Sequence, residues 1–133
     1  MRAAENPATI LIVDDNPDNL FILENLLNHV GHRVVQARDG AEALRLAITE
    51  SPDLVLMDLD MPIMDGWEAS RRLRESPQTS HLPIIALSAH ALLGDQERTL
   101  GDCCDEFISK PFNPTNVLAK IERFLSQSKG QKS

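Results

Sequence analysis

Apolar residues along this chain gather in five short runs, each about as long as a β-strand, and longer amphipathic segments separate them. The runs cover residues 9–13, 33–37, 54–57, 82–87 and 106–109. Those at 9–13 and 54–57 are apolar at almost every position, a pattern typical of strands with helices packed on both faces. Strands that alternate with helices are joined by right-handed crossovers, so the pattern predicts an α/β domain with a parallel sheet between two helical layers.

Capping residues mark where the helices between these strands begin. Asn16 and Asn113 are each followed by proline, a combination that favours an N-cap and the first helical position. Asp39 and Asp65 each precede a glutamate by three residues, which is the spacing of a capping box. These signals and the apolar stripes that follow them predict helices over about 17–30, 40–48, 66–75 and 114–125, and a fifth with a thinner stripe over 91–100.

Polar and charged side chains follow four of the five predicted strands. Asp14 and Asp15 follow the first run, Asp58 the third, Ser88 the fourth and Lys110 the fifth. The carboxyl ends of parallel strands lie at one edge of the sheet, where such sheets bind their ligands. We therefore expect three carboxylates, a hydroxyl and an amine to share one site.

Carboxylates gathered at one edge repel each other, by roughly 3 kcal/mol for a pair about 5 Å apart at an effective dielectric constant of about 20. Either a bound proton or a metal ion must relieve this repulsion. An all-oxygen ligand set suits Mg²⁺, which keeps several waters and binds phosphate oxygens. With Lys110 and Ser88 beside it, such a site fits a phosphoryl group in transfer, with a carboxylate oxygen as the nucleophile.

Composition and charge narrow the classes of function. The 133 residues, 42% hydrophobic and 25% charged, fit one globular domain, expected over 8–126 with flexible termini at 1–7 and 127–133. The net charge of −7 argues against nucleic acid as a partner, because contacts to phosphates need clustered lysine and arginine. No apolar run approaches the roughly 20 residues of a membrane span, so no membrane partner is expected.

Cysteine and histidine positions add little chemistry of their own. Cys103 and Cys104 are adjacent and poorly placed to join distant segments, which favours a reducing, cytoplasmic setting. His29 and His32 have a spacing that occurs in metal sites, but they straddle the end of the first predicted helix, which argues against zinc.

Taken together, the residues at the strand ends resemble the receiver domain of two-component response regulators. The resemblance rests on Asp14-Asp15, Asp58 followed by Met61-Pro62 and Asp65-Gly66, Ser88-Ala89, and Lys110-Pro111, and it covers about residues 8–126. The runs 81–95 and 104–111 look particularly similar to stand-alone receivers of the DivK type. The resemblance implies a single doubly wound, five-stranded parallel sheet of order 2-1-3-4-5 with five helices, the flavodoxin-like or CheY-like fold.

The resemblance also implies a role for each group at the strand ends. Asp58 would accept a phosphoryl group from a phosphohistidine of a histidine kinase or a histidine phosphotransfer protein. Mg²⁺ would be held by Asp15, Asp58 and the backbone carbonyl of Asp60, with Asp14 acting largely through water. Lys110 would pair with Asp58 and then with the phosphoryl oxygens, and the Lys110-Pro111 bond would be cis.

Signalling would follow from a coupled movement of two residues. Ser88 would hydrogen-bond the attached phosphoryl group, and Phe107 would rotate into the space that Ser88 leaves. The output would use the face formed by the fourth helix, fifth strand and fifth helix, and would act on a downstream protein. The kinase side would dock on the first helix and on the loop after Lys110, near Phe112. His90 and the side chain of Asp60 lie where family members adjust the rate of dephosphorylation.

Other readings of the chain stay open from the residues alone. The protein is expected to be a phospho-accepting signalling domain rather than an enzyme, although it could catalyse its own phosphorylation and dephosphorylation. It would be a monomer or weak dimer, acting as a stand-alone receiver, a phosphorelay shuttle or a receiver excised from a larger protein. A haloacid-dehalogenase-like phosphatase would use Asp58 and Asp60 as paired aspartates, but it departs from that pattern at Pro62 and leaves Asp14-Asp15 unexplained. A flavodoxin-like cofactor binder would need a phosphate-binding glycine loop, which the sequence lacks.

Overall fold

The computed structural model describes residues 7–60, 66–88 and 104–132. Its strands are β1 (Thr9–Val13), β2 (Arg33–Ala37), β3 (Leu54–Asp58), β4 (Ile84–Ser88) and β5 (Glu106–Ser109). They form one parallel sheet in the order β2-β1-β3-β4-β5. The predicted fold class and strand order are therefore confirmed.

The described helices are α1 (Pro17–His29), α2 (Gly40–Thr49), α3 (Gly66–Glu75) and α5 (Pro114–Lys132). Asn16 caps α1 by accepting a hydrogen bond from the backbone N–H of Asp18 (2.8 Å), and Asn113 accepts one at the start of α5 from Thr115 (2.8 Å). Asp39 caps α2 by accepting from the backbone N–H of Glu42. Each of these helices begins at its predicted cap because the cap's side chain replaces a hydrogen bond that the first turn cannot make within the helix.

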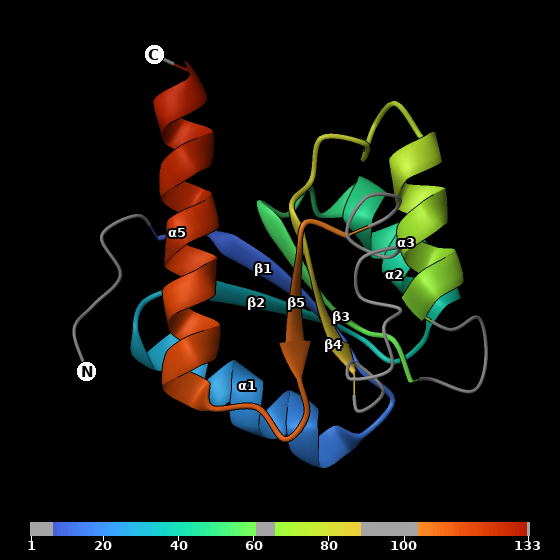
Figure 1. The fold of residues 1–133 in the computed structure, drawn as a ribbon. Coiled ribbons are helices and arrows are strands. Elements are labelled where there is room, and N and C mark those ends of the chain that lie inside the picture. Colours follow the sequence, from blue (N-terminus) through green and yellow to red (C-terminus); the bar gives the residue numbers. More distant parts are fainter. Residues whose placement is uncertain (1–6, 61–65, 89–103, 133) are drawn as a thin grey trace.

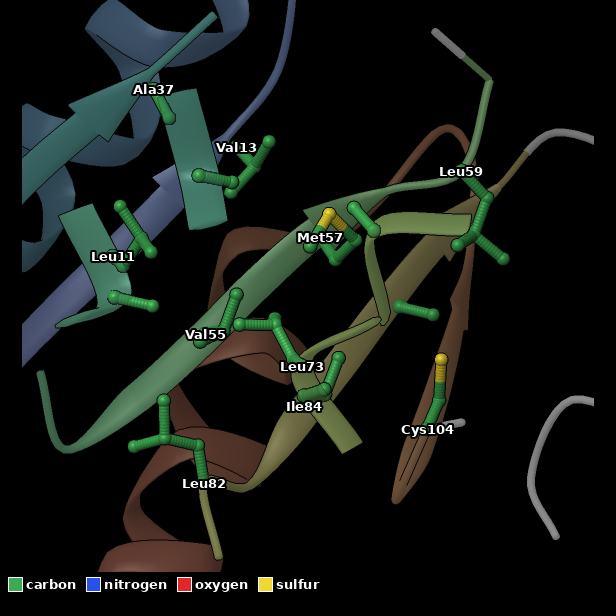
Figure 2. Packing of buried hydrophobic residues seen from close by; sticks show 14 residues of the cluster. Leu11, Val13, Ala37, Val55, Met57, Leu59, Leu73, Leu82, Ile84 and Cys104 are labelled. Carbon is green, nitrogen blue, oxygen red and sulfur yellow. The ribbon is translucent and has the colours of Figure 1, made fainter. Parts of the chain in front are cut away.

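Two apolar clusters fill the spaces on either side of the sheet. In Figure 1, α1 and α5 cover one face of the sheet, and α2 and α3 cover the other. The cluster under α2 and α3 combines strand residues such as Val55 and Met57 with Leu73 of α3, as Figure 2 shows. The opposite cluster joins Ile12 and Leu56 of the strands to both α1 and α5. The central strands are buried on both faces, which is why their sequences are apolar without alternation.

Two details of the predicted elements change or go undescribed. The expected helix over 91–100 lies outside the described residues, so four of the five expected helices are seen. Helix α5 continues to Lys132, past the amphipathic face and into the segment 127–133 that we expected as a tail. Cys104 is buried, with its thiol 3.8 Å from the Ser70 hydroxyl, whereas Cys103 lies outside the described residues. Among the helices that the structure describes, none combines the length and apolar character of a membrane span.

Candidate phosphoryl and metal site

The strand register brings the predicted site residues to one edge of the sheet. Asp14 directly follows β1, while Asp58 and Ser88 are the last residues of β3 and β4. Beyond β5, the backbone N–H of Lys110 donates to the carbonyl of Ser88 (3.0 Å), which extends the β4–β5 pairing by one residue and places Lys110 beside the site. Because all these strands run in the same direction, residues up to 96 positions apart in the chain, from Asp14 to Lys110, meet at their carboxyl ends.

Asp58 lies at the centre of this edge, and only 2% of its surface is exposed. Its Oδ1 accepts a hydrogen bond from Nζ of Lys110 (2.8 Å) and another from the backbone N–H of Asp60 (2.9 Å). A buried carboxylate stays charged only when such donors stabilise it. The two donors therefore hold an anionic oxygen ligand or nucleophile in a fixed orientation.

Asp14 is the second buried carboxylate, with 1% of its surface exposed. Its Oδ1 accepts from the backbone N–H of Asn16 (2.9 Å), and its Oδ2 accepts from the side-chain amide of Asn19 (3.2 Å). Several causes together raise the pKa of Asp14 from 3.8 to about 6. Burial is the largest cause, and the nearby charge and side chain of Asp58 also raise the pKa, whereas the hydrogen bonds from Asn16 and Asn19 lower it. The site thus carries more negative charge than its own donors neutralise.

Lys110 supplies the positive charge of the described site. Burial by itself lowers the pKa of the Lys110 ammonium, but the hydrogen bond and charge of Asp58, with the charges of Asp14 and Asp60, raise the pKa above its ordinary value. Lys110 therefore stays protonated and can neutralise a further anionic group in the site.

Three carboxylates lie close enough to share a metal ion. One oxygen each from Asp14, Asp15 and Asp58 can be chosen so that all three lie within 4.8 Å of one another. Asp14 and Asp58 are buried, whereas Asp15 is exposed and could be reached from solvent. The ligand atoms are all carboxylate oxygens, which suits a hard divalent cation such as Mg²⁺ better than zinc or copper. The residues present therefore fit the metal that the sequence predicted.

Three contacts in the site are not foreseen from the sequence, two made by the side chain of Asp60 and one by Asn19. Asp60 was assigned a role chiefly through its backbone carbonyl, yet its side chain accepts a hydrogen bond from the Ser88 hydroxyl (3.0 Å) and lies 3.5 Å from Nζ of Lys110. Asn19, which was not singled out, contacts Asp14. Its position in the first turn of α1, four residues after Asp15, is the available signal. The predicted metal contact of the Asp60 carbonyl stays a prediction.

The remaining predicted residues are placed as follows. Phe107 is half-buried and packs against the cluster under α2 and α3, and Phe112 is half-buried against the opposite cluster. The Lys110-Pro111 bond is cis, as predicted. His32 is buried and pairs with Glu122 of α5 at 2.7 Å. His90, and the residues 61, 62, 65 and 89 used in the resemblance, lie outside the described residues.

The fold and this arrangement of residues define a receiver domain, and comparison with known proteins assigns the same class. The model of the response regulator receiver domain matches residues 10–122. The chain therefore belongs to the response regulator receiver family, whose members take part in two-component signalling.

Individual relatives agree over almost the whole chain. The polar-differentiation response regulator DivK of Brucella anthropi is 34% identical over 122 residues, which are 92% of this chain and 99% of that protein. The crystal structure of the receiver domain of a sensor histidine kinase from Pseudomonas aeruginosa has a magnesium ion coordinated in its active-site cleft. It is 36% identical, with a TM-score of 0.82 over 91% of this chain and 99% of that one. A CheY-like receiver from Methanospirillum hungatei is 28% identical, with a TM-score of 0.87 over 95% of this chain and 99% of that one.

Proposed function

We propose that this protein is a phospho-accepting signalling domain in which Asp58 receives a phosphoryl group from a phosphohistidine. The observation that carries the proposal is the buried Asp58 carboxylate held by Lys110 at 2.8 Å beside two further aspartates. In the reaction the P–N bond of the donor breaks, its electron pair leaves with the imidazole, and a new P–O bond forms at Asp58. The donor would be a histidine kinase or a histidine phosphotransfer protein.

Each group around Asp58 has a distinct task in this proposal. Asp14, Asp15 and Asp58, with the backbone carbonyl of Asp60, would hold Mg²⁺, which when bound neutralises charge on the phosphoryl oxygens. Lys110 already contacts Asp58, and its ammonium would contact the phosphoryl oxygens after transfer.

The proposed switch couples Ser88 to Phe107. The Ser88 hydroxyl now donates to Asp60, so it would have to exchange that acceptor for the phosphoryl group. Phe107 lies opposite Ala86 in the β4–β5 register, and Ala86 is two residues before Ser88 on β4. The ring is half-buried, and on phosphorylation it would turn inward into the space that Ser88 leaves. The output surface would include β5 and α5, together with the segment 91–100 outside the described residues.

The docking surface for the phosphoryl donor is proposed on α1 and the loop after Lys110. Phe21 and Ile22 of α1 are 66% and 48% exposed, which is high for large apolar side chains. Both lie on the helix that follows the two acidic residues of the site. An apolar contact there would bring the donor histidine to the same edge of the sheet as Asp58.

The family assignment favours this proposal over the haloacid-dehalogenase-like phosphatase. The receiver reading gives Asp14 and Asp15 a role in the metal site, whereas the phosphatase reading leaves both without one. The two functions also differ in outcome. A receiver retains one phosphoryl group, and a phosphatase releases phosphate from many molecules of substrate.

The test is to incubate the purified protein with Mg²⁺ and acetyl phosphate or phosphoramidate and to measure its intact mass. We expect a gain of one phosphoryl group that disappears in Asp58→Asn and when Mg²⁺ is chelated. Asp53→Asn is the matched control, because Asp53 is an exposed aspartate directly before the same strand, at its opposite end. An adduct that survives in Asp58→Asn, or steady hydrolysis of phosphomonoesters without an adduct, would contradict the proposal.

A further inference from the structure

The Asp14 carboxylate is held by a donor at each of its oxygens. The backbone N–H of Asn16 donates to Oδ1 (2.9 Å), and the side-chain amide of Asn19 donates to Oδ2 (3.2 Å). A carboxylate offers about four acceptor positions, so two hydrogen bonds leave further positions for a metal ion or its water. Of the two donors, the amide of Asn19 is the one that a substitution can remove without changing the backbone.

We propose that Asn19 is a positioning residue of the metal site, and that its amide orients the Asp14 carboxylate toward the space shared with Asp15 and Asp58. The inference rests on the proposed magnesium site and extends it to a residue outside the three acids. Hydrogen bonds from outside the ligand set fix the orientation of metal ligands, and their loss typically weakens metal binding by about 10–100-fold.

The position of Asn19 on α1 explains how its side chain reaches Asp14. Asn16 is the N-cap and Pro17 the first helical residue, so Asn19 is the third. Side chains tilt toward the amino terminus of a helix, and a glutamate or glutamine at this third position usually bonds the backbone N–H of the cap. Asn19 instead bonds the carboxylate of Asp14, two residues before the cap.

The chemical type of the residue also fits this role. A glutamate at position 19 would face Asp14 with a second carboxylate and add to the repulsion within the site. The asparagine amide is neutral and donates, so it stabilises the carboxylate without changing the charge available to a cation. Its neighbour Asp18 is exposed, and the backbone N–H of Asp18 donates to the side chain of Asn16. Asp18 and Asn19 therefore have separate partners in this turn.

Helix initiation alone does not account for Asn19. The cap is already supplied by Asn16, whose side chain accepts from the backbone N–H of Asp18, and Pro17 favours the first helical position. Asparagine is a weaker helix former than leucine. A purely structural role for Asn19 therefore predicts no loss of metal affinity when leucine replaces it.

The experiment measures Mg²⁺ affinity of the purified protein by NMR titration, with unfolding in urea under chelator as a second readout. We expect Asn19→Leu to bind Mg²⁺ about tenfold more weakly than the unmodified protein, the lower end of the usual range. Leucine is close to asparagine in size but cannot donate, so the free energy of unfolding of Asn19→Leu under chelator reports the structural cost of losing the hydrogen bond separately from the loss of metal affinity. Asn25→Leu is the matched control, because the Asn25 amide donates within α1 to the Phe21 carbonyl. We expect it to leave the affinity unchanged.

A double-mutant cycle tests whether Asn19 acts through Asp14. In an Asp14→Ala background, Asn19→Leu should cause no further loss of Mg²⁺ affinity, because the carboxylate that it orients is absent. Two results would overturn the inference and leave the proposed function standing. One is an equal loss of Mg²⁺ affinity with and without Asp14, and the other is an Asn19→Leu variant that binds Mg²⁺ as tightly as the unmodified protein. An unmodified protein that binds no Mg²⁺ would overturn the proposed metal site and this inference together.

Discussion

The two edges of the sheet both carry ionisable side chains, but they balance charge in opposite ways. At the edge where the strands begin, acids meet donors. Asp53 accepts from the backbone N–H of Thr9 (2.9 Å), and Asp105 accepts from Arg74 and from the backbone N–H of Ile84 (2.8 Å). These contacts join the start of one strand to a neighbouring strand or helix, so their charges serve the assembly of the sheet.

At the edge where the strands end, acids outnumber bases. Asp14 and Asp58 are buried there beside Asp15. Among the described residues, Lys110 is the cation at this edge, where it hydrogen-bonds Asp58 and interacts with Asp14 through its charge. Burial is the largest cause of the raised pKa of Asp14, and the charge of Asp58 adds to it. The charges at the beginning of the sheet are therefore balanced within the chain, whereas its end carries an acidic cluster able to bind a metal ion.

Breaking the balanced edge should have the largest effect on stability. Arg74 donates to the carbonyls of Ser80 (2.9 Å) and Leu82 (2.7 Å) and pairs with Asp105. We expect Arg74→Ala to lower the free energy of unfolding by about 3 kcal/mol, because it removes three charge-assisted hydrogen bonds at once. Urea unfolding followed by circular dichroism measures the change.

The control for this prediction lies on the same helix. Arg72 pairs with Glu68 at 2.7 Å on an exposed surface of α3, four residues apart. We expect Arg72→Ala to cost only about 0.5 kcal/mol, since exposed pairs of this kind contribute little. Equal losses for the two arginines would show that the network at the beginning of the sheet has no special weight.

Relieving the unbalanced edge should have the opposite sign. The folded pKa of Asp14 lies near 6, above its ordinary 3.8, so the folded state binds this proton more tightly than the unfolded state does. Stability from this group is therefore fully present below about pH 3.8 and is lost as the pH rises through about 6. We expect Asp14→Asn to raise the free energy of unfolding by about 2 kcal/mol at about pH 8 under chelator, and to lose this advantage near about pH 4.

Saturating Mg²⁺ should reverse this order. Ligand binding to the folded state stabilises it, and the unmodified protein should gain more than Asp14→Asn because it retains the carboxylate. The measurement is urea unfolding at both pH values, with and without the metal. A stability gain in Asp14→Asn that is the same at both pH values would contradict a buried, charge-stressed Asp14.

The smallest effect is expected where α5 meets the start of the sheet. His32 is buried, with Nδ1 accepting from the backbone N–H of Ala8 (3.0 Å) and Nε2 lying 2.7 Å from Glu122. We expect Glu122→Gln to cost about 1 kcal/mol, because an amide oxygen can still accept but no longer carries charge.

Glu50→Gln is the matched control for Glu122. Both glutamate side chains are 33% exposed, but the partner of Glu50 is Arg33, whose side chain is 63% exposed, whereas that of His32 is 0% exposed. We expect the control to change stability by less than about 0.5 kcal/mol. If both substitutions cost the same in urea unfolding, the buried partner adds nothing.

Local patterns in the sequence specify the elements and the edge of the sheet that carries the chemistry. Asn16, Asp39 and Asn113 mark helix starts because capping depends on a few neighbouring residues. The apolar runs mark strands because burial on both faces needs apolar side chains throughout. Asp58 and Lys110 could be assigned to one site because parallel strands bring their carboxyl ends together whatever the details of packing.

The packing of the assembled layers, by contrast, selects which side chains touch within and around that edge. The contact of Asp60 with Ser88 and that of Asn19 with Asp14 depend on the direction of each side chain, which spacing along the chain does not specify. His32 and Glu122 are 90 residues apart and meet because α5 packs beside β2's start. The raised pKa of Asp14 likewise follows from burial, a property of the assembled layers rather than of any one segment.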